Sequence, residues 1–574
     1  MSESTQMIAK PTDLPLGLRR TGQISPYVLW AIVTVTSLYL RPPTAPLELE
    51  TLASAWHMWS DGVWQPLRNE LPTPQMPPLQ LWLILGGWHW TGVNEWWPRL
   101  LSPLAGLATI WLMRPAALTL WPHRRSTVHF ARILLIGLGG FVITLSMIVP
   151  EMLILPMSLA GFILMARLWT LPLSGQQRFA HLLVLMVLQT GIVMAAGWAA
   201  WLTLPIVGAL APLLDPGSSA ANTGVSTRPE GLRVLGRWWR EIVFASLPAA
   251  IMALVWLDML GSLDHWISFG NGWLDPATEA SRREVWSLIF FPVMLYPWIC
   301  WKTLWRALHR SLRDQIGTGL RLGTAYLLAT IIAGLAGGWE LQGLLPAAAP
   351  LCLIGARLLA TQEIKARDFH GVVPGFFALL IGLIFFLMNI IPTAHLDVVW
   401  RWLFGVSLPI WLGGMGLTSG LILLVAGYIL AQISPRQQLL RTLQVALLPS
   451  LLMTCLNIEF PTNLAQFFDL TPVASRLQTM QQAGQPIAIY GNYRGEFDFQ
   501  GRLLKAPDVV ETPQQAWLWA DRHPGGAILT YFDGSPIRLP ALPIYRGVAR
   551  DHWVAIWPAS AVAESDGHVL DSSF

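Results

Sequence analysis

Three glutamates stand where apolar segments of the chain meet polar ones. Glu48 and Glu50 follow the first apolar segment, and Glu151 stands at the start of another, in Pro150-Glu151-Met152. A carboxylate close to a bilayer is costly unless it is paired or used. One of the three could act as a general base while a second orients an acceptor or binds a metal ion. The alternative is that all three simply face water at the membrane surface.

Arginine supplies the opposite charge on the same side. Arg41, Arg68 and Arg99 lie in or beside the segment 41–96. A guanidinium group binds phosphate oxygens in a two-point fork, so these residues are candidates to hold an anionic phosphate at the interface. Each of them could instead anchor a helix end by extending its charge to water.

Other chemical signatures are missing from the sequence. It contains no phosphate-binding loop, HExxH zinc motif or GxSxG nucleophile elbow. His57, His89 and His265 are isolated along the chain, which favours structural roles for them. The three cysteines all lie in apolar runs, which predicts that they are small buried hydrophobic residues and not a disulfide framework.

The composition shows what kind of protein must position these residues. Of 574 residues, 53% are hydrophobic and 12% are charged, whereas soluble domains have about 25% charged residues. A membrane-spanning helix needs about 20 apolar residues. By this measure we expect an all-α polytopic membrane protein with about thirteen spans. The expected spans are 27–40, 97–118, 131–149, 152–170, 181–197, 199–214, 241–260, 286–306, 322–338, 344–361, 372–391, 407–431 and 438–456.

The positions of basic residues predict the orientation in the membrane. Cytoplasmic loops carry an excess of Lys and Arg. With the N-terminus in the cytoplasm, clusters such as Arg124-Arg125 and Arg237 with Arg240 fall on the cytoplasmic side, and an odd number of spans places the C-terminus outside. The net charge of +4 is explained by these loops, so no nucleic-acid partner is expected.

Two segments depart from the pattern of spans. Segment 41–96 is rich in Pro and Trp, which predicts an external loop with helices at 47–60 and 79–91 lying in the interface. Residues 457–574 are more polar and contain strand-like runs at 486–490 and 527–532, with helical patterns at 471–484 and 513–521. We therefore divide the chain into a membrane module, 1–456, and a small external α/β domain, 457–574.

Several local strings carry a resemblance to a known family. They are Leu47-Glu48 followed by Met58 and Asp61-Gly62-Val63-Trp64, Met76-Pro77-Pro78-Leu79 with Trp82, Gly92 to Glu95 with Arg99-Leu100, Glu151, and the stretch Tyr490 to Leu503. In these strings the chain resembles the bacterial branch of the aminoarabinose transferase and protein mannosyltransferase superfamily. These are membrane glycosyltransferases of the GT-C fold that use polyprenyl-phosphate sugars. Four places depart from the family pattern: Leu47 stands for an Asp, Met76 stands for a Lys, and basic residues of the family are replaced around Leu204 and near Trp339.

The resemblance implies a hexosyl- or pentosyltransferase of the bacterial inner membrane. The sugar would pass, with inversion, from a polyprenyl-phosphate donor to a periplasmic glycan, lipid or protein acceptor. In this hypothesis the catalytic residues are Glu48, the general base, and Glu151, which positions the acceptor or a metal ion. Arg68 and Arg99 would hold the donor phosphate, and Pro77, Pro78 and Trp82 would be structural. No cofactor is certain, but a divalent cation could be bound by Glu48, Glu50 and Glu151.

A second hypothesis stays open because of these departures. The chain could be a catalytically degenerate paralogue that binds lipid or acts as a scaffold in envelope polysaccharide assembly. The changes at Leu47 and Met76 favour this alternative, and the retained Glu48, Glu151 and Arg99 oppose it.

Overall fold

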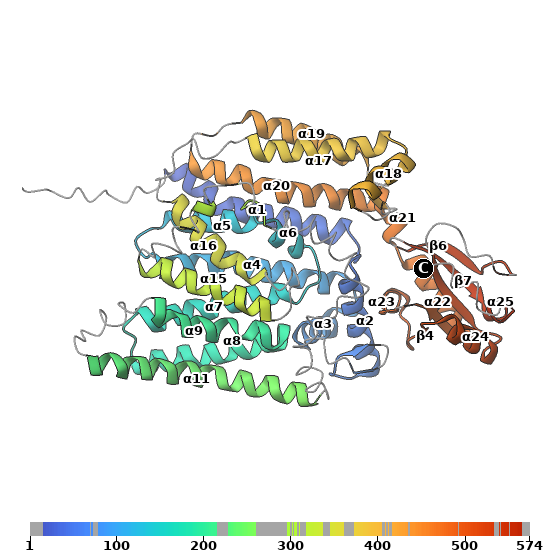
Figure 1. Cartoon of the computed structure of the whole chain (residues 1–574), viewed down its shortest axis with the longest axis horizontal. Coiled ribbons are helices and arrows are strands. Elements are labelled where there is room, and N and C mark those ends of the chain that lie inside the picture. Colours follow the sequence, from blue (N-terminus) through green and yellow to red (C-terminus); the bar gives the residue numbers. More distant parts are fainter. Residues whose placement is uncertain are drawn as a thin grey trace, which may run out of the picture.

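The structure is a computed structural model that shows a bundle of helices with a small sheet domain at one end (Figure 1). It describes residues 15–68, 71–72, 78–214, 228–259, 295–298, 301, 304–306, 309, 317–336, 345–360, 372–404, 408, 411–412, 416–433, 435, 437–491, 493–532, 539, 541–549 and 552–564.

Within these residues, eight helices are long and apolar enough to cross a membrane. They are α1 (Leu16–Leu40), α4 (Trp96–Leu120), α7 (Glu151–Thr170), α8 (Gly175–Trp201), α11 (Arg228–Met259), α15 (Thr318–Ala336), α17 (Val372–Ile390) and α20 (Gln438–Glu459). Each corresponds to one of the thirteen expected segments, so the prediction of a polytopic all-α membrane module is confirmed.

The remaining expected spans differ from the prediction. Segment 131–149 is not one straight helix, because α5 (Ser126–Ile136) and α6 (Gly139–Leu145) meet at a bend of 64°. The chain breaks at Gly137, where it passes so close to α20 that an added Cβ would lie 2.7 Å from the Cβ of Ala446. After the break, the N–H of Gly139 donates to the carbonyl of Tyr296 at 3.0 Å, outside its own helix.

Three other expected spans form helices of 12 to 16 residues, shorter than the length needed for a full crossing. They are α9 (Thr203–Leu214), α16 (Ala348–Leu359) and α19 (Leu417–Gln432). Segment 286–306 lies largely outside the described residues.

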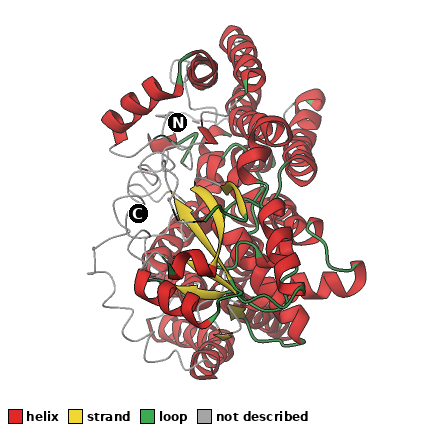
Figure 2. Ribbon diagram, turned by 90° about the vertical axis from the view of Figure 1, so that its right-hand side faces the viewer, coloured by secondary structure: helices red, strands yellow, loops and turns green. Residues whose placement is uncertain are grey.

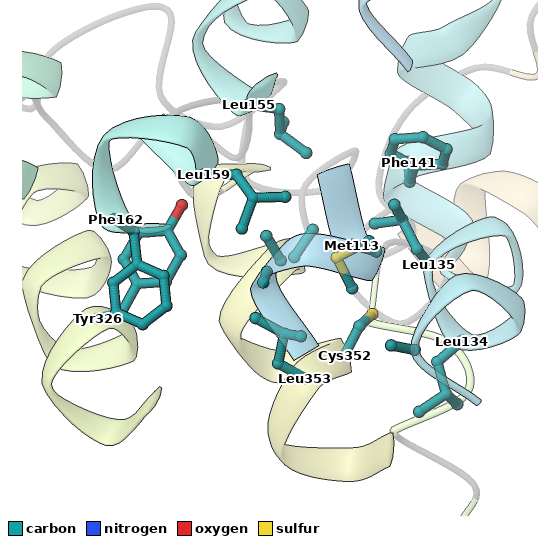
Figure 3. Packing of buried hydrophobic residues seen from close by; sticks show 14 of the residues in the cluster. Met113, Leu134, Leu135, Phe141, Leu155, Leu159, Phe162, Tyr326, Cys352 and Leu353 are labelled. Carbon is teal, nitrogen blue, oxygen red and sulfur yellow. The ribbon is translucent and has the colours of Figure 1, made fainter. Parts of the chain in front are cut away.

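The core of the bundle is built from large apolar side chains of most of its helices, and Figure 3 shows the part contributed by α4, α5, α6, α7, α15 and α16. The rings of Phe162 on α7 and Tyr326 on α15 stack with their centroids 4.4 Å apart. The hydroxyl of Tyr326 is 2.9 Å from the hydroxyl of Ser158, so this polar group is satisfied inside the core. Cys352 and Cys455 are buried free thiols, as predicted, whereas Cys300 lies outside the described residues.

The external loop contains the two helices that the sequence predicts. These are α2 (Pro46–Asp61) and α3 (Pro78–Thr91), with a short hairpin of β1 (Leu67–Arg68) and β2 (Leu71–Pro72) between them. Figure 1 shows α2 and α3 at the end of the bundle that faces the sheet domain.

The chain remains helical beyond residue 456, the predicted end of the membrane module. Helix α20 continues to Glu459, followed by a π-helical turn, η5 (Phe460–Leu464), and by α21 (Ala465–Phe468). The α/β domain then begins with α22 (Thr471–Gln482).

A five-stranded sheet organises the C-terminal domain (Figure 2). Its order is β4-β3-β5-β7-β6; β3 pairs in parallel with β4 and β5, and β7 is antiparallel to β5 and β6. The strands are β3 (Ile487–Tyr490), β4 (Asp508–Val510), β5 (Ala527–Phe532), β6 (Tyr545–Ala549) and β7 (His552–Pro558), and the helices after α22 are α23 (Asp498–Gly501), α24 (Pro513–Arg522) and α25 (Ala559–Ala563). The strands expected at 486–490 and 527–532 and the helices expected at 471–484 and 513–521 are confirmed.

The two faces of this sheet are covered by different parts of the chain. One face packs against α24 and α25. The other packs against α22, and Leu49 of α2 belongs to the same buried cluster. The sheet domain is therefore packed on the helix that carries Glu48 and Glu50.

Candidate functional site

Helix α2 carries the first two candidate carboxylates, Glu48 and Glu50. The residues at its start favour a helix beginning there. Pro46 occupies the first turn, where a missing N–H is tolerated. Glu48 is the third helical residue, and its Oε2 accepts the N–H groups of Thr44 and Ala45, each at 3.0 Å. This is the reach-back contact of a capping box, so the Glu48 carboxylate stabilises the start of its own helix.

Glu48 also joins three separate segments of the chain. Its carboxylate pairs with Arg41, which follows the end of α1, and both side chains are buried (3% and 0% exposed). Its Oε1 accepts the N–H of Ile148 at 3.0 Å, while Arg41 donates to the carbonyl of Ser146. The alternative that Glu48 simply faces water is therefore wrong: the carboxylate is fully buried and accepts at least four hydrogen bonds.

Arg99 lies beside this ion pair. It belongs to the first turn of α4, is 7% exposed, and donates to the carbonyl of Ser37 on α1. Its Nε is buried without a hydrogen-bond partner. Arg41 and Glu48 are both within electrostatic range of its guanidinium group. Two buried arginines thus share one region with the Glu48 carboxylate.

Glu151 lies close by along the chain. It is the first residue of α7 and half-buried, three residues after the Ile148 amide that binds Glu48. Glu50 is buried on α2, but two residues along a helix do not share a face with Glu48. Among the described residues, no three His, Cys, Asp or Glu side chains group closely enough to hold a metal ion. Glu48, Glu50 and Glu151 therefore do not form a three-carboxylate site.

The other predicted residues of the external loop are only partly described. Arg68 belongs to strand β1, but its side chain lies outside the description, as do Met76 and Pro77. Pro78 is buried and starts α3. The indole N–H of Trp82 on that helix donates to the carbonyl of Trp64 at 2.9 Å. Trp82 therefore links α3 to the chain that follows α2.

A buried polar junction at the other end of α2 was not predicted. His57 is not isolated: its Nε2 lies 2.9 Å from Oδ2 of Asp498, and both side chains are fully buried. The hydroxyl of Tyr493 donates to the other oxygen of Asp498. Burial and the adjacent Asp498 carboxylate raise the pKa of Tyr493 well above its usual value, so this hydroxyl stays protonated.

Aromatic contacts surround this junction. The indole N–H of Trp56 donates to the carbonyl of Leu503 at 2.7 Å, and the guanidinium of Arg502 lies 4.1 Å from the ring centroid of Phe499. Phe499 stacks on Trp88 of α3 at 5.5 Å. Both external helices are therefore docked on the sheet domain.

Comparison with known proteins identifies the architecture. No protein-family model matches the sequence, and no curated protein sequence matches it either. Among solved structures, apo ArnT from Cupriavidus metallidurans superimposes with a TM-score of 0.67 at 15% identity, over 95% of this chain and 99% of ArnT. The chain has the ArnT fold. The structure of the same ArnT bound to undecaprenyl phosphate has a TM-score of 0.64 at 14% identity, over 94% and 98% of the two chains.

The ArnT fold spans both parts of this chain. Because the match covers nearly all of each protein, the membrane module and the sheet domain belong to one architecture. The GT-C fold expected from the local strings is confirmed. At 15% identity the similarity shows the fold alone. The roles of individual residues must therefore be argued from their geometry in this chain.

The Arg41–Glu48 pair predicts a specific loss of stability. Replacing Arg41 with Met leaves a buried carboxylate without its cation, which typically costs about 3–5 kcal/mol. We expect a lower melting temperature for Arg41→Met in thermal unfolding of the detergent-purified protein. The Arg41→Met/Glu48→Gln double variant should be less destabilised than the sum of its single variants. Strictly additive losses would show that the two side chains are not coupled.

Proposed function

We propose that this protein is a membrane glycosyltransferase that takes its sugar from a polyprenyl-phosphate donor. The observation that carries the proposal is the ArnT fold over 95% of the chain, since an ArnT of this fold binds undecaprenyl phosphate. The second support is chemical. Arg41 and Arg99 lie together at the end of the bundle where α2 and α3 cover it, and Arg99 has a buried nitrogen without a partner.

A lipid phosphate as leaving group determines what the site has to do. As the sugar–phosphate bond breaks, negative charge grows on the phosphate oxygen, and preorganised cations lower the energy of that state. Arg99, with Arg41 or a divalent cation, would supply this charge, and Arg68 stays a candidate from the loop. The acceptor hydroxyl attacks from the opposite side of the anomeric carbon, and its proton passes to a carboxylate. One such displacement inverts the sugar configuration.

The geometry favours different roles for the carboxylates. Glu48 accepts hydrogen bonds from three backbone N–H groups and is paired with Arg41, so its lone pairs are engaged in holding the site together. We therefore assign Glu48 to positioning the site instead of to the general-base role expected from the sequence. Glu151, half-buried at the start of α7, is the better candidate for the proton acceptor, with Glu50 as the other.

The same arrangement supports an orientation in the membrane. Helices α2 and α3 and the sheet domain lie at one end of the bundle (Figure 1). Arg124 and Arg125 lie in the turn after α4, the helix that begins beside α3. By the positive-inside rule that turn faces the cytoplasm. We place the sheet domain in the periplasm of a bacterial inner membrane and the N-terminus in the cytoplasm, with a glycan, lipid or protein acceptor in the periplasm.

A non-catalytic, lipid-binding or scaffolding protein is the second candidate. The saturated Glu48 carboxylate and the Leu at position 47 favour it, because the family's carboxylate pair is then reduced to one engaged residue. This candidate requires donor-lipid binding without sugar transfer.

Binding of the donor phosphate tests the proposal at Arg99. Undecaprenyl phosphate should bind the detergent-purified protein, and Arg99→Met should weaken that binding about tenfold or more, since it removes a charge-assisted contact from a poorly solvated region. Native mass spectrometry measures the bound lipid. Arg240→Met, which changes an exposed arginine on α11, is the control. Equal binding by wild type and Arg99→Met would place the phosphate elsewhere.

Glutamine variants distinguish the proposed proton acceptor, Glu151, from Glu48, which we assign to positioning the site. Removing a general base typically lowers the rate by about 10²- to 10⁴-fold. Glu151→Gln should lose transfer at an unchanged melting temperature, whereas Glu48→Gln should lose stability as well, because Arg41 loses its partner. The measurement is release of labelled sugar from the polyprenyl-phosphate donor, with Glu50→Gln in parallel. Donor binding without any transfer by the wild type would favour the non-catalytic candidate.

Reporter fusions test the orientation. Alkaline phosphatase, which is active only outside the cytoplasm, should be active when fused after Phe574 and inactive when fused after Arg125. In our assignment α25, the last described helix of the sheet domain, and the turn that contains Arg125 lie at opposite ends of the bundle (Figure 1). An inactive fusion at Phe574 together with an active one at Arg125 would reverse the proposed orientation.

A further inference from the structure

A second group of cationic side chains lies at the opposite end of the bundle, between α1, α4 and α5. Its centre is Arg132 on α5, which is 6% exposed. Arg132 Nε donates to the carbonyl of Ile110 at 3.0 Å, and Nη2 lies 3.4 Å from the carbonyl of Trp111. Its guanidinium group also lies 5.4 Å from the ring centroid of Tyr27 on α1. These neighbours are carbonyls and a ring, and none carries a full negative charge.

Two further arginines add positive charge near Arg132, and a histidine belongs to the same group. Arg114 on α4 is within electrostatic range of Arg132, and His129 on α5 is within range of both Arg132 and Arg19. His129 is 6% exposed, and its Nδ1 is buried without a hydrogen-bond partner. In the part of the chain that the structure describes, no carboxylate contacts any of these four side chains. Arg132, Arg114 and Arg19 therefore form a cationic cluster with a buried centre, and no carboxylate of the described residues contacts it.

One atom of the cluster is open to a ligand. Arg132 Nη1 makes no hydrogen bond with the described residues, and it is not among the fully buried polar atoms. An unpaired charge in a poorly solvated place is costly, so an anion that reached this nitrogen would be bound favourably. The guanidinium fork fits a phosphate group well.

The surroundings favour a lipid as the source of that phosphate. Arg132 lies six residues after the start of α5, and Arg114 six residues before the end of α4, each about 9 Å from its helix end. That depth is within reach of a phosphate in the head-group layer. The adjoining surface is apolar, since Ile24 and Val28 on α1 and Trp111 on α4 are exposed. Acyl chains can pack on such a surface, whereas a free anion gains nothing from it.

We propose that this cluster is a binding site for the phosphate of an anionic phospholipid in the leaflet opposite the sheet domain. Basic pockets between membrane helices on the cytoplasmic side are suited to such head groups. The site is separate from the Arg41–Glu48 region, and it does not depend on the proposed transferase activity.

Native mass spectrometry of the full-length protein in detergent tests the site. The probes are phosphatidylglycerol and phosphatidylcholine with identical acyl chains, and inorganic phosphate alone. We expect the wild type to prefer phosphatidylglycerol and Arg132→Met to bind it at least about tenfold more weakly. Arg114→Gln and Arg19→Gln should each weaken binding about fivefold, the effect of one charge near an anionic surface.

A matched control makes the outcome decisive. Arg240→Met should leave phosphatidylglycerol binding unchanged, because this exposed arginine on α11 lies outside the cluster. If Arg132→Met does not fold, the variants at the less buried Arg114 and Arg19 decide the question. Equal binding of the two lipids by the wild type, unchanged binding in the Arg114 and Arg19 variants, or binding of inorganic phosphate without phosphatidylglycerol would overturn the proposal.

Discussion

The burial of the Glu48 carboxylate beside Arg41 is the interaction on which the candidate site depends. A sealed carboxylate is stable only with a cation and with hydrogen bonds to its remaining lone pairs. Here these come from the residue after α1, from the start of α2 and from the turn before α7. The Arg41–Glu48 pair therefore fixes the start of α2 against the end of α1. It also holds the turn that precedes α7 next to the start of α2.

Helix α2 is held at its other end by a second buried polar contact. His57 and Asp498 join it to the sheet domain, and Tyr493 satisfies the second oxygen of Asp498. Buried polar groups are costly when unsatisfied, so the contacts of Asp498 with His57 and Tyr493 favour this docking geometry. The sheet domain thus acts on the site indirectly, by holding the helix that carries Glu48 and Glu50.

The fold depends on apolar packing, whereas the site depends on individual charged residues. The fold can therefore match that of ArnT at 15% identity. A helical core tolerates many apolar substitutions provided that volume and pattern are kept. Leu47 stands where the family that the sequence resembles has an Asp, and it packs against the apolar core of the bundle, so the architecture is retained without that carboxylate. The bundle also separates two kinds of arginine group. Arg41 and Arg99 lie with a carboxylate near the sheet domain, whereas Arg132 has none at the far end.

The sequence by itself determined the membrane character of the chain, eight of its long helices, both external helices and the strands β3 and β5. These features depend on hydropathy and on periodicity among neighbouring residues, which can be read locally. It also indicated the region of the site through Glu48, Arg99 and Glu151. It did not reveal the bend at Gly137, which results from the close approach of α20. Only the tertiary structure decided that Glu48 is sealed by Ile148, 100 residues away, and that His57 pairs with Asp498, 441 residues away. Such contacts depend on how distant segments pack, and no local pattern of residues carries that information.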